Sequence, residues 1–352
     1  MKTILIFLFI FTFATFAFSN TSEFEKIVDL YKIEKNFNGT VIVATAGKID
    51  FISGIGVADR NTNVKITPQS KFKIASITKT FTAVLILKLY EQGKIDLNAT
   101  IGKYFPEYKG VGKDKVTIHQ LLTYSSGIAN ESEKLEMLSY KSPLSLDEYI
   151  DKYCSGKLEF EAGSKSAYGN TEYIILGKII ENVTGESFDK VLKTYILSPL
   201  KMKNSGMASA KKSDSKLVKS YTQNEKSKVF EIDAPYFIEN YFASGAMYST
   251  VEDLLKFDTA IFTGKLLKPQ TTELMLKTYP NLGNVAYGFW GSDGFGNFAE
   301  KFYYRPGGIL GSTANWLHTV ENKKTIIVMS NTDATNLFEL SEKLYLASLG
   351  KK

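Results

Sequence analysis

Stretches with strand character lie at both ends of this chain, and their placement limits the folds open to it. Near the N-terminus, residues 39–44 and 49–52 are rich in β-branched and aromatic residues and flank a turn at Ala46–Lys48. Near the C-terminus, residues 313–317 and 325–329 flank a second turn. One antiparallel sheet that takes strands from both ends accommodates both hairpins.

The long interval between those hairpins is expected to be mostly helices and loops. Helical spacing of apolar residues predicts helices over residues 22–35, 76–91, 117–123, 146–153, 171–184, 187–196, 251–262 and 337–349. We therefore expect an α/β (α+β) fold in which helices flank the antiparallel sheet. Its sheet part would comprise about residues 20–75 and 245–352, and an inserted, mostly helical subdomain about residues 76–244.

Ser76 and Lys79 stand three positions apart in the sequence SITK, which opens a long apolar helix. Residues i and i+3 share a helix face, so the hydroxyl and the amine are expected side by side. A poorly solvated lysine loses its proton readily and can then accept the proton of the serine. The pattern alone is common, since Ser-x-x-Lys also begins at Ser70, Ser187, Ser198, Ser209, Ser213 and Ser348. The pair of Ser76 and Lys79 is distinguished by its context, because it alone opens a long apolar helix.

A second candidate segment is Tyr168-Gly169-Asn170, which precedes the predicted helix 171–184. A tyrosine beside a lysine ammonium has a lowered pKa and can pass a proton to a leaving group. Asn170 would hold Lys79 and a substrate carbonyl. The alternative is structural, since an asparagine at this place also caps a helix.

A third candidate segment, Arg305-Pro306-Gly307-Gly308, comes immediately before the predicted C-terminal strands. Glycines there let a substrate lie against a strand, and a backbone N–H can point at a developing oxyanion. Taken alone, the segment is equally well explained as an ordinary loop that enters a strand.

Together these segments resemble the serine β-lactamase and penicillin-binding-protein superfamily, in particular its class C-like branch of D-aminopeptidases, D-Ala-D-Ala carboxypeptidases and esterases. Ser76-x-x-Lys79, Tyr168-x-Asn170 and Arg305-x-Gly307 occupy the places of its three motifs. The resemblance covers nearly all of the chain after the first 19 residues. Further similar stretches are VTIHQLLTYSSG at 116–127, FEAGSKSAYGNTEYIILG at 160–177 and ASGAMYSTVED at 243–253.

The resemblance implies that Ser76 attacks an acyl carbon and forms an acyl-enzyme, with Lys79 and Tyr168 transferring protons. Backbone N–H groups of Ser76 and Gly308 would form the oxyanion hole, and water would hydrolyse the ester. No cofactor is needed. The implied substrates are small esters, amides or peptides, including peptides of D-amino acids and cell-wall peptides.

The third motif departs from the family, which has Lys-Thr-Gly or His-x-Gly where this chain has Arg305-Pro306-Gly307. Arginine stays protonated, so Arg305 can bind a carboxylate but cannot relay a proton. Pro306 lacks a hydroxyl, and we expect weak or absent β-lactamase activity. The alternatives are a true β-lactamase or D-Ala-D-Ala carboxypeptidase, and a non-catalytic binding protein on the same fold.

Substrate preference in such a fold depends on the walls of the pocket. The expected wall-forming loops are residues 205–242 and 291–303. Candidate lining residues are Tyr124, Ser125, Tyr287, Phe289, Trp290 and Tyr304.

Composition and charge limit the classes of partner and the kinds of site that the chain is expected to have. The net charge of +6 is spread along the chain, and no basic stripe with interleaved aromatics is present, so a nucleic-acid partner is not expected. Cys154 is the only cysteine, which excludes an internal disulfide, and it is expected to be a small buried residue. His119 and His318 lack metal-ligand spacing, so no metal site is expected.

The first residues have the features of a secretory signal. Lys2 precedes an apolar run from Ile4 to Phe18, and small residues precede a cleavage point expected after Ser19. The prediction is therefore an exported protein, periplasmic or secreted, with no stable membrane anchor after cleavage. The alternative is an uncleaved anchor, for which the run is short.

Overall fold

The computed structural model describes residues 23–131, 136–210, 216–294 and 296–351. The predicted signal segment, residues 1–19, and its cleavage point lie outside these residues. None of the helices in the described ranges has the length and apolar character needed to cross a membrane.

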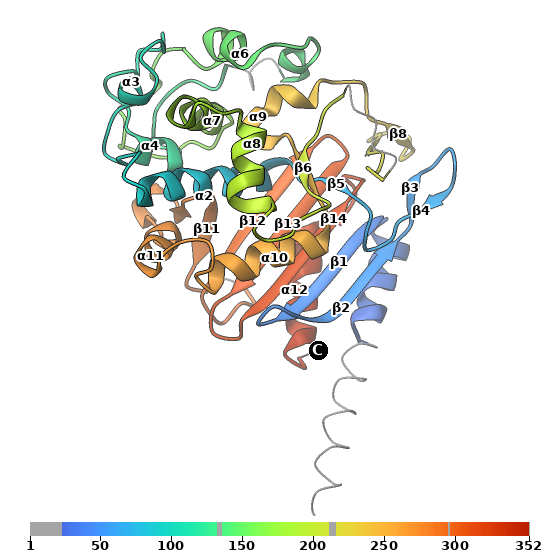
Figure 1. Cartoon of the computed structure of the whole chain (residues 1–352). Helices are drawn as coiled ribbons and strands as arrows, with labels where there is room; N and C mark the ends of the chain where they lie inside the picture. The colour runs from blue at the N-terminus through green and yellow to red at the C-terminus, as the bar shows by residue number, and fades with distance from the viewer. Residues whose placement is uncertain (1–22, 132–135, 211–215, 295, 352) are drawn as a thin grey trace, which may run out of the picture.

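A seven-stranded antiparallel sheet has the order β10-β11-β12-β13-β14-β1-β2, which confirms the prediction of one sheet drawn from both chain ends (Figure 1). Strand β1 pairs with β14, with Val41 opposite Val328, so the first and last strands of the chain lie side by side. The strands are β1 (Gly39–Thr45), β2 (Lys48–Ile55), β10 (Val285–Ala286), β11 (Phe289–Ser292), β12 (Phe302–Ile309), β13 (Ser312–Thr319) and β14 (Lys324–Ser330).

The two faces of this sheet bury alternate residues. Val41 and Val43 pack with helix α12 (Leu337–Ser348) and with a helix over residues 23–34, whereas Ile42 and Ala44 belong to the core on the opposite face. This period of two is the ordinary consequence of strand geometry. Helix α10 (Val251–Phe262) covers that opposite face (Figure 1).

A group of helices lies over one end of the sheet (Figure 1). Its central helix is α2 (Thr78–Glu91), which is almost wholly buried. The other helices are α3 (Ile101–Tyr104), α4 (Ile118–Leu122), α6 (Leu146–Tyr153), α7 (Thr171–Thr184), α8 (Phe188–Leu192), α9 (Phe242–Gly245) and α11 (Pro269–Leu276). Single turns are η1 (Ala75–Ile77), η2 (Glu136–Tyr140), η3 (Lys193–Leu197), η4 (Ile238–Tyr241) and η5 (Pro280–Leu282).

Seven short strands form three small sheets in the described residues, β3-β4, β5-β9-β6 and β7-β8. They are β3 (Val57–Asp59), β4 (Val64–Lys65), β5 (Phe72–Lys73), β6 (Gly206–Met207), β7 (Tyr221–Gln223), β8 (Phe230–Ile232) and β9 (Met247–Ser249). Strand β9 pairs with β5, which leads directly into η1, so residues from the middle of the chain are held against the turn that carries Ser76.

The third candidate segment is placed differently from the prediction. Arg305, Pro306, Gly307 and Gly308 lie inside β12 rather than in a loop before the strands. The proline is tolerated there because β11 pairs with β12 only at residues 302–304, which leaves the edge beyond them without a strand neighbour in the described chain.

Candidate active site

Ser76 lies in the 3₁₀ turn η1, immediately before α2 begins at Thr78. The sequence prediction placed the serine in the helix itself, yet the consequence is the same, because Lys79 follows three positions later in the first turn of α2 and lies on the same side of the chain. The Lys79 amine lies 3.1 Å from the Ser76 hydroxyl. Ala75, just before the serine, has a positive φ of 46°, a strained conformation for a residue with a side chain.

Lys79 is fully buried, and its nitrogen contacts four oxygen atoms. It donates to Asn170 Oδ1 at 2.7 Å and to the carbonyl oxygen of Ser244 at 3.0 Å. Both of these oxygens can only accept hydrogen bonds, so together they bind two N–H groups of the Lys79 nitrogen. The remaining position of the nitrogen faces the hydroxyls of Ser76 and Tyr168, both 3.1 Å away. This position is an N–H in the ammonium form and a lone pair in the neutral amine, which suits proton transfer.

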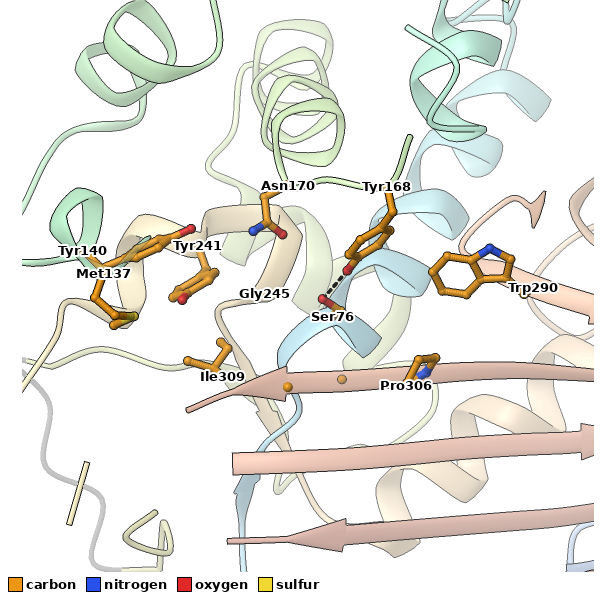
Figure 2. Close-up of a pocket in the computed structure, with 12 residues that line it drawn as sticks. Ser76, Met137, Tyr140, Tyr168, Asn170, Tyr241, Gly245, Trp290, Pro306 and Ile309 are labelled. Atoms are coloured by element: carbon orange, nitrogen blue, oxygen red, sulfur yellow. Dashed lines mark hydrogen bonds between the residues drawn. The ribbon is translucent and has the colours of Figure 1, made fainter. Parts of the chain in front are cut away.

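Tyr168 completes a triangle of hydroxyl, amine and phenol. Its hydroxyl donates to Ser76 Oγ at 2.6 Å and points into the site, although 44% of the residue's surface is exposed (Figure 2). Burial of the hydroxyl by itself raises the pKa of Tyr168, but the nearby charges of Lys79 and Arg305 outweigh it and lower the pKa to about 8. A measurable fraction of the phenolate is therefore expected near neutral pH.

The Arg305 side chain approaches the catalytic groups from the protein interior and does not line the pocket. Its side chain is fully buried and donates to the Ser76 carbonyl at 2.9 Å, to the Tyr124 hydroxyl at 2.9 Å and to the Tyr168 hydroxyl at 3.4 Å. From the sequence, Arg305 is expected to bind a substrate carboxylate. The geometry instead gives Arg305 the role of a fixed cation beneath Tyr168, and it is not among the residues that line the pocket.

Gly307 and Gly308 bring the strand β12 against the nucleophile. A Cβ atom at Gly307 would collide with the carbonyl oxygen of Ile74 and would lie 3.2 Å from the Ser76 nitrogen. A Cβ atom at Gly308 would meet open space. The backbone of β12 at Gly307 therefore lies against the backbone of Ser76. The N–H groups of Ser76 and Gly308 stay the predicted donors to an oxyanion.

These groups form the floor of a pocket of about 870 Å³ (Figure 2). None of its described lining residues is charged, and most are aromatic or apolar. The lining residues are Ser76, Met137, Tyr140, Tyr168, Asn170, Tyr241, Gly245, Trp290, Pro306, Gly307, Gly308 and Ile309.

Of the six side chains predicted to line the pocket, only some lie near it. Trp290 lines the pocket, and Tyr124 lies buried behind it against Arg305. Tyr287 and Phe289 are buried in the core, and Ser125 bonds to Thr123. Tyr304 lines a neighbouring groove.

Sequence reasoning missed the wall formed by Met137, Tyr140 and Tyr241. Tyr140 and Tyr241 stack with their ring centroids 3.9 Å apart, although they are a hundred positions apart in the chain. Of the two loops expected to shape the pocket, residues 205–242 contribute Tyr241, whereas the described residues of 291–303 line the neighbouring groove instead. An aromatic residue in a loop carries no signal of its partner, so only the folded chain brings this pair together.

Cys154, His119 and His318 are not among the residues that line the pocket. Burial raises the pKa of the Cys154 thiol to about 12, as suits a buried structural cysteine. His318 faces Asp258 at 3.0 Å beneath Phe262, and His119 contacts the Tyr287 hydroxyl at 2.7 Å. Within the described ranges, no three histidine, cysteine or acidic side chains are grouped as metal ligands.

Asn130 is a further residue that the sequence did not single out. Its side-chain oxygen accepts from the backbone N–H groups of Asn170 and Thr171, both at 3.1 Å. Asn170 itself makes no capping bond to α7, contrary to the structural alternative, so its side chain is available to Lys79. Asn130 therefore supplies the cap of α7 and positions the Tyr168–Asn170 segment.

We expect Asn130→Ala to lower kcat roughly 10- to 100-fold, because loss of the cap lets Asn170 and Tyr168 shift relative to Ser76. KM should change little, and the free energy of unfolding should fall by about 1 kcal/mol. Asn130→Asp keeps the accepting oxygen and serves as the matched control. Steady-state kinetics and thermal melts check both variants, and an alanine variant that melts earlier but keeps its kcat would contradict the positioning role.

The chain is similar to one family model, one curated relative and two solved structures. Residues 24–351 match the family model described as Beta-lactamase. A teichoic acid D-alanine hydrolase of Staphylococcus aureus (strain MRSA252) is 30% identical over 270 residues, which are 75% of this chain and 65% of that protein. The chain thus aligns with about 65% of the length of this curated relative.

Two solved structures share the fold. The octameric penicillin-binding protein homologue from Pyrococcus abyssi has a TM-score of 0.82 at 25% identity, over 94% of this chain and 78% of that one. A D-amino acid amidase from Ochrobactrum anthropi SV3, complexed with D-phenylalanine, has a TM-score of 0.81 at 20% identity, over 94% and 99% of the two chains. At that identity, the second likeness concerns the fold alone.

Proposed function

This chain belongs to the beta-lactamase family of hydrolases, and on that premise we propose that it is an exported serine hydrolase that forms an acyl-enzyme on Ser76. Its substrates are small esters and amides, including those of D-amino acids. The observation that carries the proposal is the triangle of Ser76, Lys79 and Tyr168, with all three heavy-atom distances at or below 3.1 Å on the floor of an open pocket. The D-alanine hydrolase suggests the substrate class, and the N-terminal segment suggests export.

Acylation begins when the Ser76 oxygen attacks the carbonyl carbon. The proton of Ser76 passes to the phenolate oxygen of Tyr168, while the carbonyl electron pair moves to the oxygen and is held by the backbone N–H groups of Ser76 and Gly308. Lys79 and Arg305 stabilise the phenolate before this step, since both donate to its oxygen. No metal or cofactor takes part in this scheme.

Collapse of the tetrahedral intermediate breaks the bond to the leaving group, which takes the proton from Tyr168. Water then attacks the ester on Ser76, and Tyr168 accepts a proton from that water. The second collapse releases the acid and returns the proton to Ser76. Lys79 contacts both hydroxyls and links them throughout the cycle.

The proposal is tested by incubating the protein with p-nitrophenyl acetate and with D-alanine ethyl ester and recording intact mass and product release. An acyl adduct on Ser76 with Ser76-dependent turnover is expected. A protein that gains no mass with either ester or with a fluorophosphonate would favour the non-catalytic binding protein.

The pH dependence should follow Tyr168. Its pKa is lowered to about 8, and the active form is the phenolate, so kcat/KM should rise with pH and level off above that value. Tyr168→Phe should lower kcat/KM roughly 100- to 1,000-fold and remove this dependence. A pH–rate profile of both proteins checks this, and an unchanged profile in the phenylalanine variant would assign the titration to another group.

The β-lactamase alternative is disfavoured by the pocket. Pro306 offers no hydroxyl, and Arg305 lies beneath the site with its guanidinium already bonded to three oxygens. A β-lactam carboxylate would thus lack its usual partners on β12. We expect a chromogenic cephalosporin to be turned over at least about 100-fold more slowly than an activated ester, and rapid hydrolysis in a spectrophotometric assay would support a true β-lactamase.

A further inference from the structure

A second hollow lies beside the catalytic pocket and shares one residue with it. This aromatic groove has a volume of about 410 Å³. Trp290 lines both hollows. The other side chains of the groove that matter here are Phe302, Tyr304, Phe338, Asn284 and Ser292.

The aromatic rings of the groove form a connected row. Trp290 stacks on Tyr304 with centroids 6.0 Å apart, and Tyr304 meets Phe338 edge to face at 5.7 Å. All three rings are only partly buried. Trp290 is held in place from the catalytic side, because the Arg305 guanidinium lies 4.8 Å from its ring centroid. Partly exposed aromatics grouped in a hollow are typical of a binding site.

The position of the proton donor decides which part of a substrate faces this groove. The leaving group must take its proton from Tyr168, so its oxygen lies on the Tyr168 side of Ser76. The Tyr168 and Trp290 rings are neighbours, with centroids 5.4 Å apart. Met137 and Tyr140 lie on the opposite side of Ser76 (Figure 2). The acyl group therefore extends toward that wall, and the leaving group extends toward Trp290 and the groove.

The chemistry of the groove indicates the kind of leaving group. No charged side chain is among its described lining residues, which argues against a phosphate or a carboxylate as the ligand. Aromatic faces contact the C–H face of a sugar ring, while the Asn284 amide can donate to and accept from sugar hydroxyls. The Ser292 hydroxyl donates to the Gly294 carbonyl and can still accept from a sugar hydroxyl. We propose that the aromatic groove is a leaving-group subsite for a neutral glycosyl unit attached to the alcohol of an ester substrate. This inference rests on the proposed esterase function.

The test compares two D-alanyl esters that share the acyl group, the ethyl ester and the glucosyloxyethyl ester. For the unmodified protein, kcat/KM should be roughly fivefold higher for the glucosyl ester. Phe338→Ala and Tyr304→Ala should each remove most of this preference through KM and leave the ethyl ester unchanged. Phe338 is the cleaner site, because it lies on α12 and contacts Tyr304 rather than Trp290 in the aromatic row. Phe338→Leu, which keeps most of the apolar volume and removes the aromatic face, is a second variant in case alanine perturbs folding.

Tyr90→Ala serves as the control, since Tyr90 is an exposed tyrosine that lines neither hollow. Equal rates for the two esters, or a preference that survives in both groove variants, would overturn the subsite. A D-alanyl phenylethyl ester is a further comparison. If its kcat/KM exceeds that of the ethyl ester by as much as the glucosyl ester does, and the same variants remove this increase, the glycosyl assignment is overturned. Failure of the proposed function is distinct, because the ethyl ester would then show no hydrolysis that depends on Ser76.

Discussion

Ser76→Ala is expected to lower kcat/KM for an activated ester roughly 10⁴- to 10⁶-fold and to abolish the acyl adduct. The reason is that Ser76 is the residue whose hydroxyl is in contact with both Lys79 and Tyr168, so its loss removes the nucleophile that these groups activate. The fold should be unaffected, because the Lys79 nitrogen keeps its bonds to Asn170 and Ser244.

The matched control is Ser187→Ala, which alters another Ser-x-x-Lys pattern. Ser187 caps the short helix α8 by accepting from the Lys190 backbone N–H. Its removal should cost about 1 kcal/mol of stability and leave turnover unchanged. Ester hydrolysis and intact mass measure both variants, and a folded Ser76→Ala protein that keeps a tenth of its activity would place the nucleophile elsewhere.

Lys79→Met should lower kcat roughly 1,000-fold, because the variant loses the group that links the Ser76 and Tyr168 hydroxyls. It should also shift the residual pH profile to higher pH. The sign follows from the charge: the Lys79 cation lowers the pKa of Tyr168 to about 8, so its removal raises that pKa and less phenolate is present at a given pH. Methionine keeps the length and apolar stem of the buried side chain.

Lys73→Met is the control for removal of a semi-buried cation. Lys73 belongs to the Ser70-x-x-Lys73 pattern, and its amine donates to Ser220 and Tyr236 rather than to Ser76. Its kcat and pH profile should stay close to those of the unmodified protein. A pH–rate series checks both, and a Lys79→Met profile that keeps its midpoint would contradict the coupling between Lys79 and Tyr168.

The local sequence pattern was sufficient to predict many of the strands and helices of this protein. Runs of β-branched and aromatic residues beside turns predicted the strands β1, β2, β13 and β14, and period-3.6 runs predicted α7, α10 and α12 within a few residues. These elements are set by the spacing of apolar residues that must face one side. The short strands β10 and β11 were not predicted, because two to four residues carry too little pattern.

The identities of Ser76, Lys79 and Tyr168 were also available from the sequence, through their spacing and their resemblance to one family. Their roles as catalytic groups remain predictions until the variants are measured. The structure adds the distances that such roles require, and it changes the interpretation of Arg305 from a carboxylate ligand to a buried cation under Tyr168.

The sequence by itself determined the strands at both chain ends, the longer helices and the motifs that carry chemistry, because each depends on residues close together in the chain. Tertiary structure alone decided what surrounds them. The stacked pair Tyr140–Tyr241, the cap from Asn130 to α7 and the aromatic groove all join segments distant in sequence. Such contacts depend on how whole elements pack, and the spacing within any one segment does not encode that packing.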